Sequence, residues 1–353
     1  MSTIGIHHIT VCASGAQEDV DFLTKVCGQR LIKQTILFDG RYAHYHLYYA
    51  NADCQTGSVY TTFPYKRVPG RPGSGQIQSV AYSVPHGTLS FWSEHLRRHN
   101  VPHGSIQERF GQSFIRFSHP AGLQLEVIED SADQRKGWTT AEISSDVTTR
   151  GFHGPVLSVR EIPETERFFV EALGFRKTGV DAAFHRFEVG SGGAAKTVTL
   201  LHEPEQPAGT WTFGAGTAHH LALEFESDEK LAQQKELYDE LGYTDCSEIK
   251  DRNYFHSIYC RCPGGILVEC AATASGGFTR DEAPEQLGTS LLLPPWFESR
   301  RPEILAMLEP LTVPHNNLPA ISVSGTVPSS VPQGGAQPSR RAPIFIAGQD
   351  HQE

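Results

Sequence analysis

The feature of this sequence that most limits how it can fold is an internal duplication. Three segments of the first half recur in the second half with similar residues at similar spacing, and such self-similarity indicates a repeat architecture. The matching segments are 5–28 with 151–174 at an offset of 146 residues (151 − 5), 75–81 with 216–222 at an offset of 141 (216 − 75), and 120–126 with 263–269 at an offset of 143 (263 − 120). The chain is therefore predicted to be a duplicated pair of modules.

Each quarter of the repeat has the pattern of one strand, one helix and three further strands. Short runs separated by turn residues predict the later strands, among them 41–50, 58–63, 113–117 and 254–261. The helices are expected over residues 16–27, 88–100, 163–173 and 227–241. Gly28, Gly174 and Gly242 follow three of these helices and suit left-handed caps. The fold class is thus α+β, with four βαβββ modules.

The same reading divides the chain into consecutive parts. The first pair of modules covers 4–130, a polar linker 131–150 follows, and the second pair covers 151–275. Residues 276–311 contain a Pro-Pro-Trp segment and a short helix expected over 302–308, so they are predicted to pack back on the core. Residues 312–353 are rich in Pro, Ser and Gly and poor in apolar residues, which predicts a disordered tail.

Composition excludes several classes of function. The chain has 353 residues, 39% of them hydrophobic, which suffices for one large domain or two ordinary ones. A net charge of −10 without basic clusters disfavours binding to nucleic acid or to an anionic membrane. We expect neither a membrane span nor a secretory signal, because no apolar run is long enough. Seven cysteines without a regular framework predict reduced thiols and a cytoplasmic location.

Three strand-like runs carry residues that could bind a metal. Residues 217–225 alternate so that His220 lies on a polar face, opposite the face of His219 and three apolar residues. Near the N-terminus, alternation along residues 5–12 likewise places His8 and Thr10 on one face and His7 on the other. An apolar strand contains the lone Glu269, and burying an isolated carboxylate is costly unless it is paired or binds a cation. Single histidines are usually structural, but two imidazoles and a carboxylate together form the facial set that holds Fe(II).

Several motifs give this chain a resemblance to a known group of proteins. They are IHHIT at 6–10, YHLYY at 45–49, TAHHLA at 217–222, DRNYF at 251–255, SIY at 257–259, PGG at 263–265 with Glu269, and LPPW at 293–296. The chain resembles the vicinal-oxygen-chelate superfamily of glyoxalases, bleomycin-resistance proteins and extradiol dioxygenases. Within it the chain is most similar to the ring-cleaving dioxygenases that open hydroquinones and chlorinated hydroquinones, over about residues 4–311.

The resemblance implies a fold, a cofactor and a set of site residues. It implies that the modules form two cupped β-barrels around an Fe(II) centre, with Mn(II) as the alternative metal. The implied substrates are a small aromatic diol, a hydroquinone or catechol, and O2. The implied metal ligands are His8, His220 and Glu269, and the residues around the open coordination positions are His7, Thr10, Arg252 and Tyr259.

Two of these residues have implied roles in the reaction. Tyr259 would act as acid or base toward the phenolic proton, and Arg252 would hold negative charge in the site. Without the resemblance, packing as a strand aromatic is the favoured interpretation of Tyr259, and Arg252 could equally be a surface partner of Asp251.

The sequence departs from the family pattern at three positions of one strand. His256, Cys260 and Cys262 replace residues of other types. Alternation places both cysteines opposite Tyr259, so we expect them to alter packing rather than chemistry. These departures bear on the choice of substrate more than on the metal.

The positions of the ligands predict how the modules pair. His8 belongs to module 1, whereas His220 and Glu269 belong to module 4, so modules 1 and 4 must share the barrel that bears the metal. Modules 2 and 3 then form the other barrel. Across the repeat, His8 becomes Gly154, His220 becomes Ser79, and Glu269 becomes Glu126, which leaves one complete set of ligands and makes Glu126 a vestigial or structural acid. We expect His153 to be structural.

Three other functions compete with the dioxygenase interpretation. A glyoxalase-type isomerase would normally need a second carboxylate ligand, and residues 58–64 of module 1 contain no acid. A metal-free binding or resistance protein of the same fold would not need the ligand set. A nucleic-acid-binding or scaffold protein is disfavoured by the charge. The sequence leaves open whether the chain forms a homo-oligomer.

Overall fold

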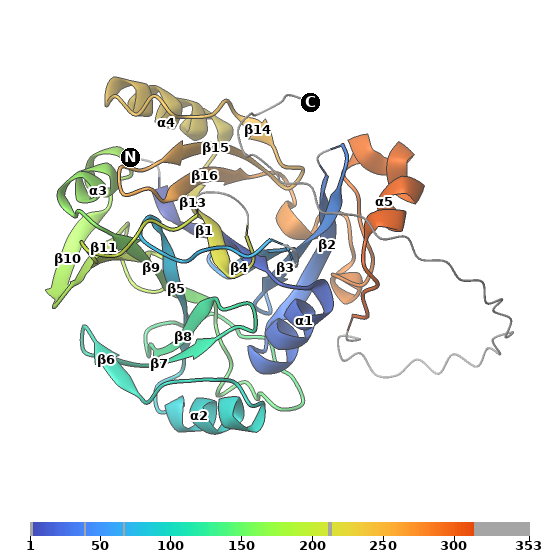
Figure 1. Ribbon diagram of the computed structural model, residues 1–353, viewed down its shortest axis with the longest axis horizontal. Coiled ribbons are helices and arrows are strands. Elements are labelled where there is room, and N and C mark those ends of the chain that lie inside the picture. Colours follow the sequence, from blue (N-terminus) through green and yellow to red (C-terminus); the bar gives the residue numbers. More distant parts are fainter. Residues whose placement is uncertain (1–2, 39, 66–67, 211–213, 314–353) are drawn as a thin grey trace, which may run out of the picture. The chain divides into compact units, whose positions relative to one another are not determined.

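Two eight-stranded β-sheets form the framework of the described chain (Figure 1). The structure is a computed structural model, and it describes residues 3–38, 40–65, 68–210 and 214–313. In the first sheet the strand order is β14-β15-β16-β13-β1-β4-β3-β2, and in the second it is β10-β11-β12-β9-β5-β8-β7-β6. Most of the predicted tail, residues 314–353, lies outside the described residues.

The strands of the first sheet come from the two ends of the duplicated region. They are β1 (Thr3–Ala13), β2 (Arg30–Phe38), β3 (Ala43–Ala50), β4 (Val59–Pro64), β13 (Thr217–Phe225), β14 (Lys250–Asp251), β15 (Phe255–Arg261) and β16 (Leu267–Thr273). The strands of the second sheet come from between them. They are β5 (Gln76–Val84), β6 (Gln107–Arg109), β7 (Gln112–Ser118), β8 (Gln124–Glu129), β9 (Phe152–Val159), β10 (Arg176–Asp181), β11 (Phe184–Glu188) and β12 (Thr197–His202).

The pairing of the modules is the one that the ligand positions predict. Modules 1 and 4 form the first sheet through antiparallel pairing of β1 with β13, seen side by side in Figure 1. Modules 2 and 3 form the second sheet through β5 and β9. Register shifts interrupt both of these central pairings, and such bulges increase strand twist and bending. The sheets are accordingly curled into cups, which confirms the predicted α+β architecture of two cupped sheets.

The four predicted helices are present, but two of them change type along their length. α1 (Ala16–Asp21) continues as the π-helix η1 (Phe22–Val26), and α3 (Pro163–Arg167) continues as the π-helix η2 (Phe168–Ala172). An apolar repeat near 3.6 residues does not distinguish a π-helical turn from an α-helical one, so the sequence missed this change. The glycines predicted as caps all have positive φ, at 65° for Gly28, 77° for Gly174 and 83° for Gly242.

The other helices begin and end close to the predicted residues. α2 spans Leu89–Arg98 and α4 spans Asp228–Glu240. The Oγ atom of Ser227 accepts a hydrogen bond from the backbone N–H of Lys230 at 3.4 Å, which caps the N-terminus of α4. Among the described helices, none combines the length and the apolar composition that a membrane span requires.

The strands alternate between a core face and a cup face, as the sequence predicts. On β1 and β13, Ile9, Val11, Leu221 and Leu223 are fully buried in one cluster with helix residues such as Leu231. His8 and His220 alternate with them and so face the other way. Tyr238 belongs to this core as well, and its hydroxyl lies 3.3 Å from the Sγ atom of Cys270. The side chains of Cys260 and Cys262 are buried in the same cluster.

The segment that follows β16, the last strand of module 4, contacts module 1. It contains the short 3-10 helices η3 (Gly277–Thr279), η4 (Pro284–Gln286) and η5 (Pro295–Arg300), followed by α5 (Arg301–Met307). Ile304 is fully buried in a small cluster with Ile36 and Phe38 of β2. The Oε1 atom of Glu309 accepts a hydrogen bond from the backbone N–H of Ala16 at 2.8 Å. These contacts attach the segment to the outer strands of the first sheet.

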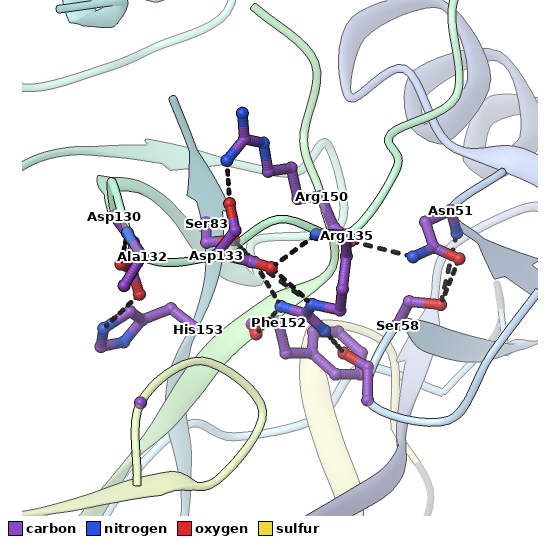
Figure 2. A network of polar contacts seen from close by, with 12 residues as sticks. Asn51, Ser58, Ser83, Asp130, Ala132, Asp133, Arg135, Arg150, Phe152 and His153 are labelled. Carbon is purple, nitrogen blue, oxygen red and sulfur yellow. Dashed lines mark hydrogen bonds and ion pairs between the residues drawn. The ribbon is translucent and has the colours of Figure 1, made fainter. Parts of the chain in front are cut away.

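A buried ion pair fastens the segment between the two halves to both sheets (Figure 2). The guanidinium of Arg135 lies 2.7 Å from Asp133 Oδ2 and donates to the carbonyl oxygens of Gly57 at 2.8 Å and Phe152 at 2.7 Å. Gly57 precedes β4 of the first sheet, and Phe152 begins β9 of the second. Ser83 of β5 also donates to Asp133. Burial by itself would raise the pKa of Asp133, but the bonds from Arg135 outweigh it and hold this pKa below its usual value.

Replacing Asp133 with Ala should destabilise the protein strongly. Its side chain is buried and its loss leaves Arg135 without a counter-ion, and breaking a buried pair in this way costs about 3–5 kcal/mol. The free energy of unfolding in denaturant measures the effect. Glu94→Ala, which removes the exposed i,i+3 pair with Arg97, should leave the unfolding midpoint nearly unchanged. Equal midpoints for both variants would show that the Asp133 network contributes no stability.

Candidate metal centre

Three potential metal ligands from three strands meet in the cup of the first sheet. His8 lies on β1, His220 on β13 and Glu269 on β16. Ala222 is opposite His8 in one pairing and opposite Glu269 in the other, so the register brings the three side chains to one place. The Nε2 atoms of the two histidines are 3.0 Å apart, and they lie 3.1 Å and 3.0 Å from Oε2 of Glu269. The structure therefore brings together all three residues predicted to bind the metal.

The donor atoms fit a divalent ion held at three adjacent positions. Bonds of about 2.1 Å meeting at right angles place neighbouring donors about 3.0 Å apart, whereas a tetrahedral arrangement needs about 3.4 Å. The side chains are almost wholly enclosed, with His8 1%, His220 6% and Glu269 0% exposed. Oε2 of the fully buried Glu269 faces both imidazoles. A buried carboxylate facing two imidazoles is the chemistry of a cation site.

The electrostatics of the site favour the ligand forms of Glu269 and His220. Burial would raise the pKa of Glu269, but the imidazoles of His220 and His8 outweigh it and hold that pKa well below its usual value. Burial lowers the pKa of His220, which keeps the imidazole neutral. An anionic carboxylate and neutral imidazoles are the states that bind a metal ion.

A second histidine contacts each of the two histidines predicted to bind the metal. The Nδ1 atoms of His7 and His8 share a hydrogen bond of 2.7 Å, and those of His219 and His220 share another of 2.7 Å. Each ligand thus uses Nδ1 for this bond and presents Nε2 to the metal position. The far nitrogen of His7 lies 3.0 Å from Oγ1 of Thr273. Partners of this kind fix the orientation and the tautomer of a ligand.

Of these two additional histidines, His7 was predicted as a site residue and His219 was not. The resemblance implied that His7 borders the open coordination positions, whereas the structure places its ring against Nδ1 of His8. His219 was not predicted as a site residue, because alternation assigns it to the core face of its strand. The signal that could have found it is the repeated His-His pair, which is present at 7–8 and again at 219–220.

A chain of hydrogen bonds borders the metal position on the side of module 1. Oγ1 of Thr10 lies 2.7 Å from Oγ1 of Thr61, which lies 3.0 Å from Nε2 of His46. Nδ1 of His46 lies 3.2 Å from the hydroxyl of Tyr48. Burial, followed by the nearby imidazoles of His8 and His220, holds the pKa of His46 well below its usual value. Thr10 was predicted as a site residue, but His46 and Tyr48 were not. They are two residues apart in β3 and therefore lie on the same face of that strand.

Tyr259 and Arg252 border the site on the side of module 4. Tyr259 is opposite Glu269 in the pairing of β15 with β16, and its ring centre is 5.6 Å from that of His220. Burial and then the charge of Glu269 raise the pKa of Tyr259 far above its usual value, so its hydroxyl stays protonated. The guanidinium of Arg252 lies 5.2 Å from the centre of the Tyr259 ring. Asp251, the alternative partner for Arg252, instead lies 4.0 Å from His256.

The comparisons with known proteins agree with this geometry. No family model matches the chain. It is 40% identical over 314 residues to a chlorohydroquinone/hydroquinone 1,2-dioxygenase of Sphingobium indicum, covering 88% of this chain and 97% of that protein. It is 36% identical to MhqO of Bacillus subtilis, named as a ring-cleaving dioxygenase, over 88% of this chain and 97% of that protein. The chain belongs to the family of ring-cleaving dioxygenases.

Solved structures support the same family and the fold. A Bacillus subtilis protein titled as a dioxygenase superposes with a TM-score of 0.83 at 35% identity, over 89% of this chain and 99% of that one. Glyoxalase I of maize superposes with a TM-score of 0.55 at 14% identity, over 76% of this chain and 92% of that one. The second likeness concerns the fold alone. This dioxygenase therefore shares its two cupped sheets with glyoxalase I.

In the second sheet of the dioxygenase, the position that corresponds to the candidate metal centre is occupied by different side chains. Ser79 and Gly154 flank Glu126 there, as the repeat predicts. Ser79 donates to Oε1 of Glu126 at 2.9 Å, and the guanidinium groups of Arg109 and Arg116 lie 2.6 and 2.7 Å from its two oxygens. A Cβ atom at Gly154 would lie 2.2 Å from the carbonyl oxygen of Thr197, which leaves no space for a ligand side chain. Arginines thus neutralise the carboxylate in this cup.

His153, which corresponds to His7 across the repeat, also has protein partners. Its Nε2 atom lies 3.2 Å from the side-chain nitrogen of Gln112 and 3.9 Å from Asp130. Burial and then the neighbouring Arg186 lower its pKa to about 3, so the ring is neutral at physiological pH. These contacts support a structural role for His153.

Replacing Glu269 with Gln should abolish metal binding in this cup of the dioxygenase. The change removes the only anionic ligand of the three, so metal content measured by elemental analysis should fall by about one ion per chain. Ser79→Ala is the matched control, because it alters the corresponding cup of the second sheet and should leave metal content unchanged. Wild-type metal content in Glu269→Gln would contradict the assignment of this centre.

Replacing His7 or His219 with Phe should weaken metal binding without removing a ligand. Each change deletes the partner of a ligand's Nδ1 atom, and loss of such a partner typically costs about 10–100-fold in metal affinity. Competition with a calibrated chelator measures the dissociation constant. Gln, which can still accept the hydrogen bond, should recover part of the loss. Unchanged affinity in both Phe variants would show that the paired histidines serve packing alone.

Proposed function

We propose that this dioxygenase holds Fe(II) with His8, His220 and Glu269 and cleaves the ring of a hydroquinone or catechol in the extradiol manner, using O2. The observation that carries the proposal is the triangle of donor atoms, because its 3.0–3.1 Å edges fit three adjacent ligands and leave three positions for substrate and O2. The name of the relative from Sphingobium indicum supports the substrate class. Mn(II) is the alternative metal. When bound, the metal ion supplies a site for a deprotonated substrate oxygen and the redox chemistry that O2 requires.

Arg252 and Tyr259 act on the substrate from one side of the site. The guanidinium of Arg252 attracts the anionic oxygen of a bound hydroquinone and holds the charge that develops during ring opening. Tyr259 is opposite Glu269 in the strand pairing and its hydroxyl is protonated, so it can donate a hydrogen bond to a substrate oxygen and exchange its proton with that oxygen. The two residues work together because the guanidinium lies over the phenol ring.

Polar groups of module 1 and the ring of Phe255 from β15 position the substrate and exclude water. The chain from Thr10 through Thr61 to His46 offers hydroxyl and imidazole groups that can bond a second substrate oxygen. The ring of Phe255 lies 5.0 and 5.1 Å from the rings of His7 and His8 and covers these histidines with apolar surface. An aromatic diol matches this combination of apolar surface and paired polar groups.

The direct test is oxygen consumption with a panel of aromatic diols. The purified protein is loaded with Fe(II) without oxygen and mixed with hydroquinones, chlorinated hydroquinones and catechols before O2 is added. We expect O2 uptake at one mole per mole of substrate and the chromophore of a ring-opened product. Metal-loaded protein that consumes no O2 with any member of the panel would contradict the proposal.

The structure argues against the glyoxalase-type isomerase that the sequence left open. β4 pairs with β1 as β16 pairs with β13, so Thr61, opposite Thr10, takes the position that corresponds to Glu269, opposite Ala222. A second carboxylate ligand of an isomerase would lie at this position. Its occupation by Thr61 leaves three protein ligands and favours the dioxygenase. The donor triangle likewise argues against a metal-free binding protein.

Replacing Tyr259 with Phe should lower kcat for ring opening by about 100-fold or more with metal content unchanged. The variant keeps the aromatic ring but loses the hydroxyl that moves the substrate proton. Tyr254→Phe is the matched control on the neighbouring loop, since its hydroxyl donates to Asp281 at 2.8 Å rather than facing the site. An unchanged single-turnover rate for Tyr259→Phe would assign Tyr259 to packing.

A further inference from the structure

A second group of potential metal ligands lies outside the cup, where α2 meets the segment between the two halves. His95 and His99 are four residues apart and therefore lie on one face at the end of α2, with ring centres 4.5 Å apart. Oε2 of Glu142 lies 3.0 Å from Nε2 of His99 and 3.9 Å from Nδ1 of His95. One donor atom from each residue falls within 4.8 Å of the other two. This set is separate in sequence from every residue of the metal centre.

The buried histidine of this set is already oriented as a ligand. Nε2 of His95 lies 3.0 Å from the carbonyl oxygen of Val26. A carbonyl can only accept, so Nε2 carries the proton and Nδ1 presents a lone pair. His95 is fully buried, and its Nδ1 atom has no hydrogen-bond partner among the described residues. Metal-binding histidines typically donate their other N–H to a carbonyl in this way.

We propose that His95 Nδ1, His99 Nε2 and a carboxylate oxygen of Glu142 bind a divalent transition-metal ion of the zinc class. Two imidazoles and one carboxylate, with a water as the fourth ligand, are a common donor set for zinc. Tetrahedral bonds of about 2.1 Å need donors about 3.4 Å apart, and the observed 3.0 and 3.9 Å bracket that value. Glu142 is largely exposed, so its side chain can make the remaining adjustment.

The ion would join parts of the chain that are distant in sequence. α2 belongs to module 2, Glu142 lies in the segment between the halves, and Val26 belongs to η1 of module 1. A neighbouring cation opposes binding, since Nη1 of Arg98 lies 3.8 Å from Oε2 of Glu142. Zinc should therefore stabilise the fold by fixing this segment on α2, and Arg98→Gln should bind zinc more tightly than wild type.

Zinc titration of four proteins tests the proposal. Wild type should bind two ions per chain, one in the cup and one at this site, and His220→Ala should retain the second. Glu142→Gln should bind only one ion, or bind the second at least 10-fold more weakly. His86→Ala is the matched control, because it removes a more exposed histidine that lies 3.0 Å from Glu129, and it should still bind two ions. Calorimetry gives the stoichiometry and the affinities.

Thermal unfolding supplies a second measurement. Zinc should raise the Tm of His220→Ala by at least about 2 °C and should not raise the Tm of a variant that carries both His220→Ala and Glu142→Gln. Two ions bound with wild-type affinity by Glu142→Gln would overturn the proposal. Failure of His220→Ala to bind any zinc would overturn it as well. Since the side chain of Glu142 is about half exposed, at 47%, and Gln has nearly the same size and shape, the Gln variant should fold as wild type does.

Discussion

The antiparallel pairing of β1 with β13 is the interaction on which the metal centre depends. It joins the first module to the fourth and so brings His8 beside His220. Slipping this pairing by one residue would turn the side chains of one strand to the opposite face. The apolar residues that alternate with the ligands, among them Ile9 and Leu221, are fully buried and oppose such a slip. The core therefore holds the ligand geometry as well as the fold.

The two cups show two solutions to one problem of buried charge. Each contains a fully buried glutamate at the equivalent place, and such a carboxylate must meet a cation. Around Glu126 the cations are the guanidinium groups of two arginines, and a glycine leaves no room for a ligand. Around Glu269 the neighbours are two imidazoles whose lone pairs suit a metal. Duplication thus supplied two similar frameworks, and a few side chains make one of them the candidate metal centre.

The prediction from sequence succeeded where a local pattern carries the information and failed where it does not. Alternation and the repeat located His8, His220 and Glu269 and implied that the outer modules pair. His219 was missed because the same alternation assigns it to the core, although its Nδ1 atom bonds His220. His46 was missed because nothing in its own strand shows that it faces Thr61 across the sheet. The π-helical ends of two helices were missed since their apolar spacing resembles that of an α-helix.

The sequence by itself determined the four modules, their helices and strands, and which residue types could bind a metal, because these follow from periodicity and from the cost of burying charge. Tertiary structure alone decided the 3 Å donor triangle, the place of Thr61 at the position in module 1 that corresponds to Glu269, and the meeting of His95 and His99 with Glu142. These features depend on the register between strands and on the packing of segments far apart along the chain. Neither quantity is encoded in the pattern of any single segment.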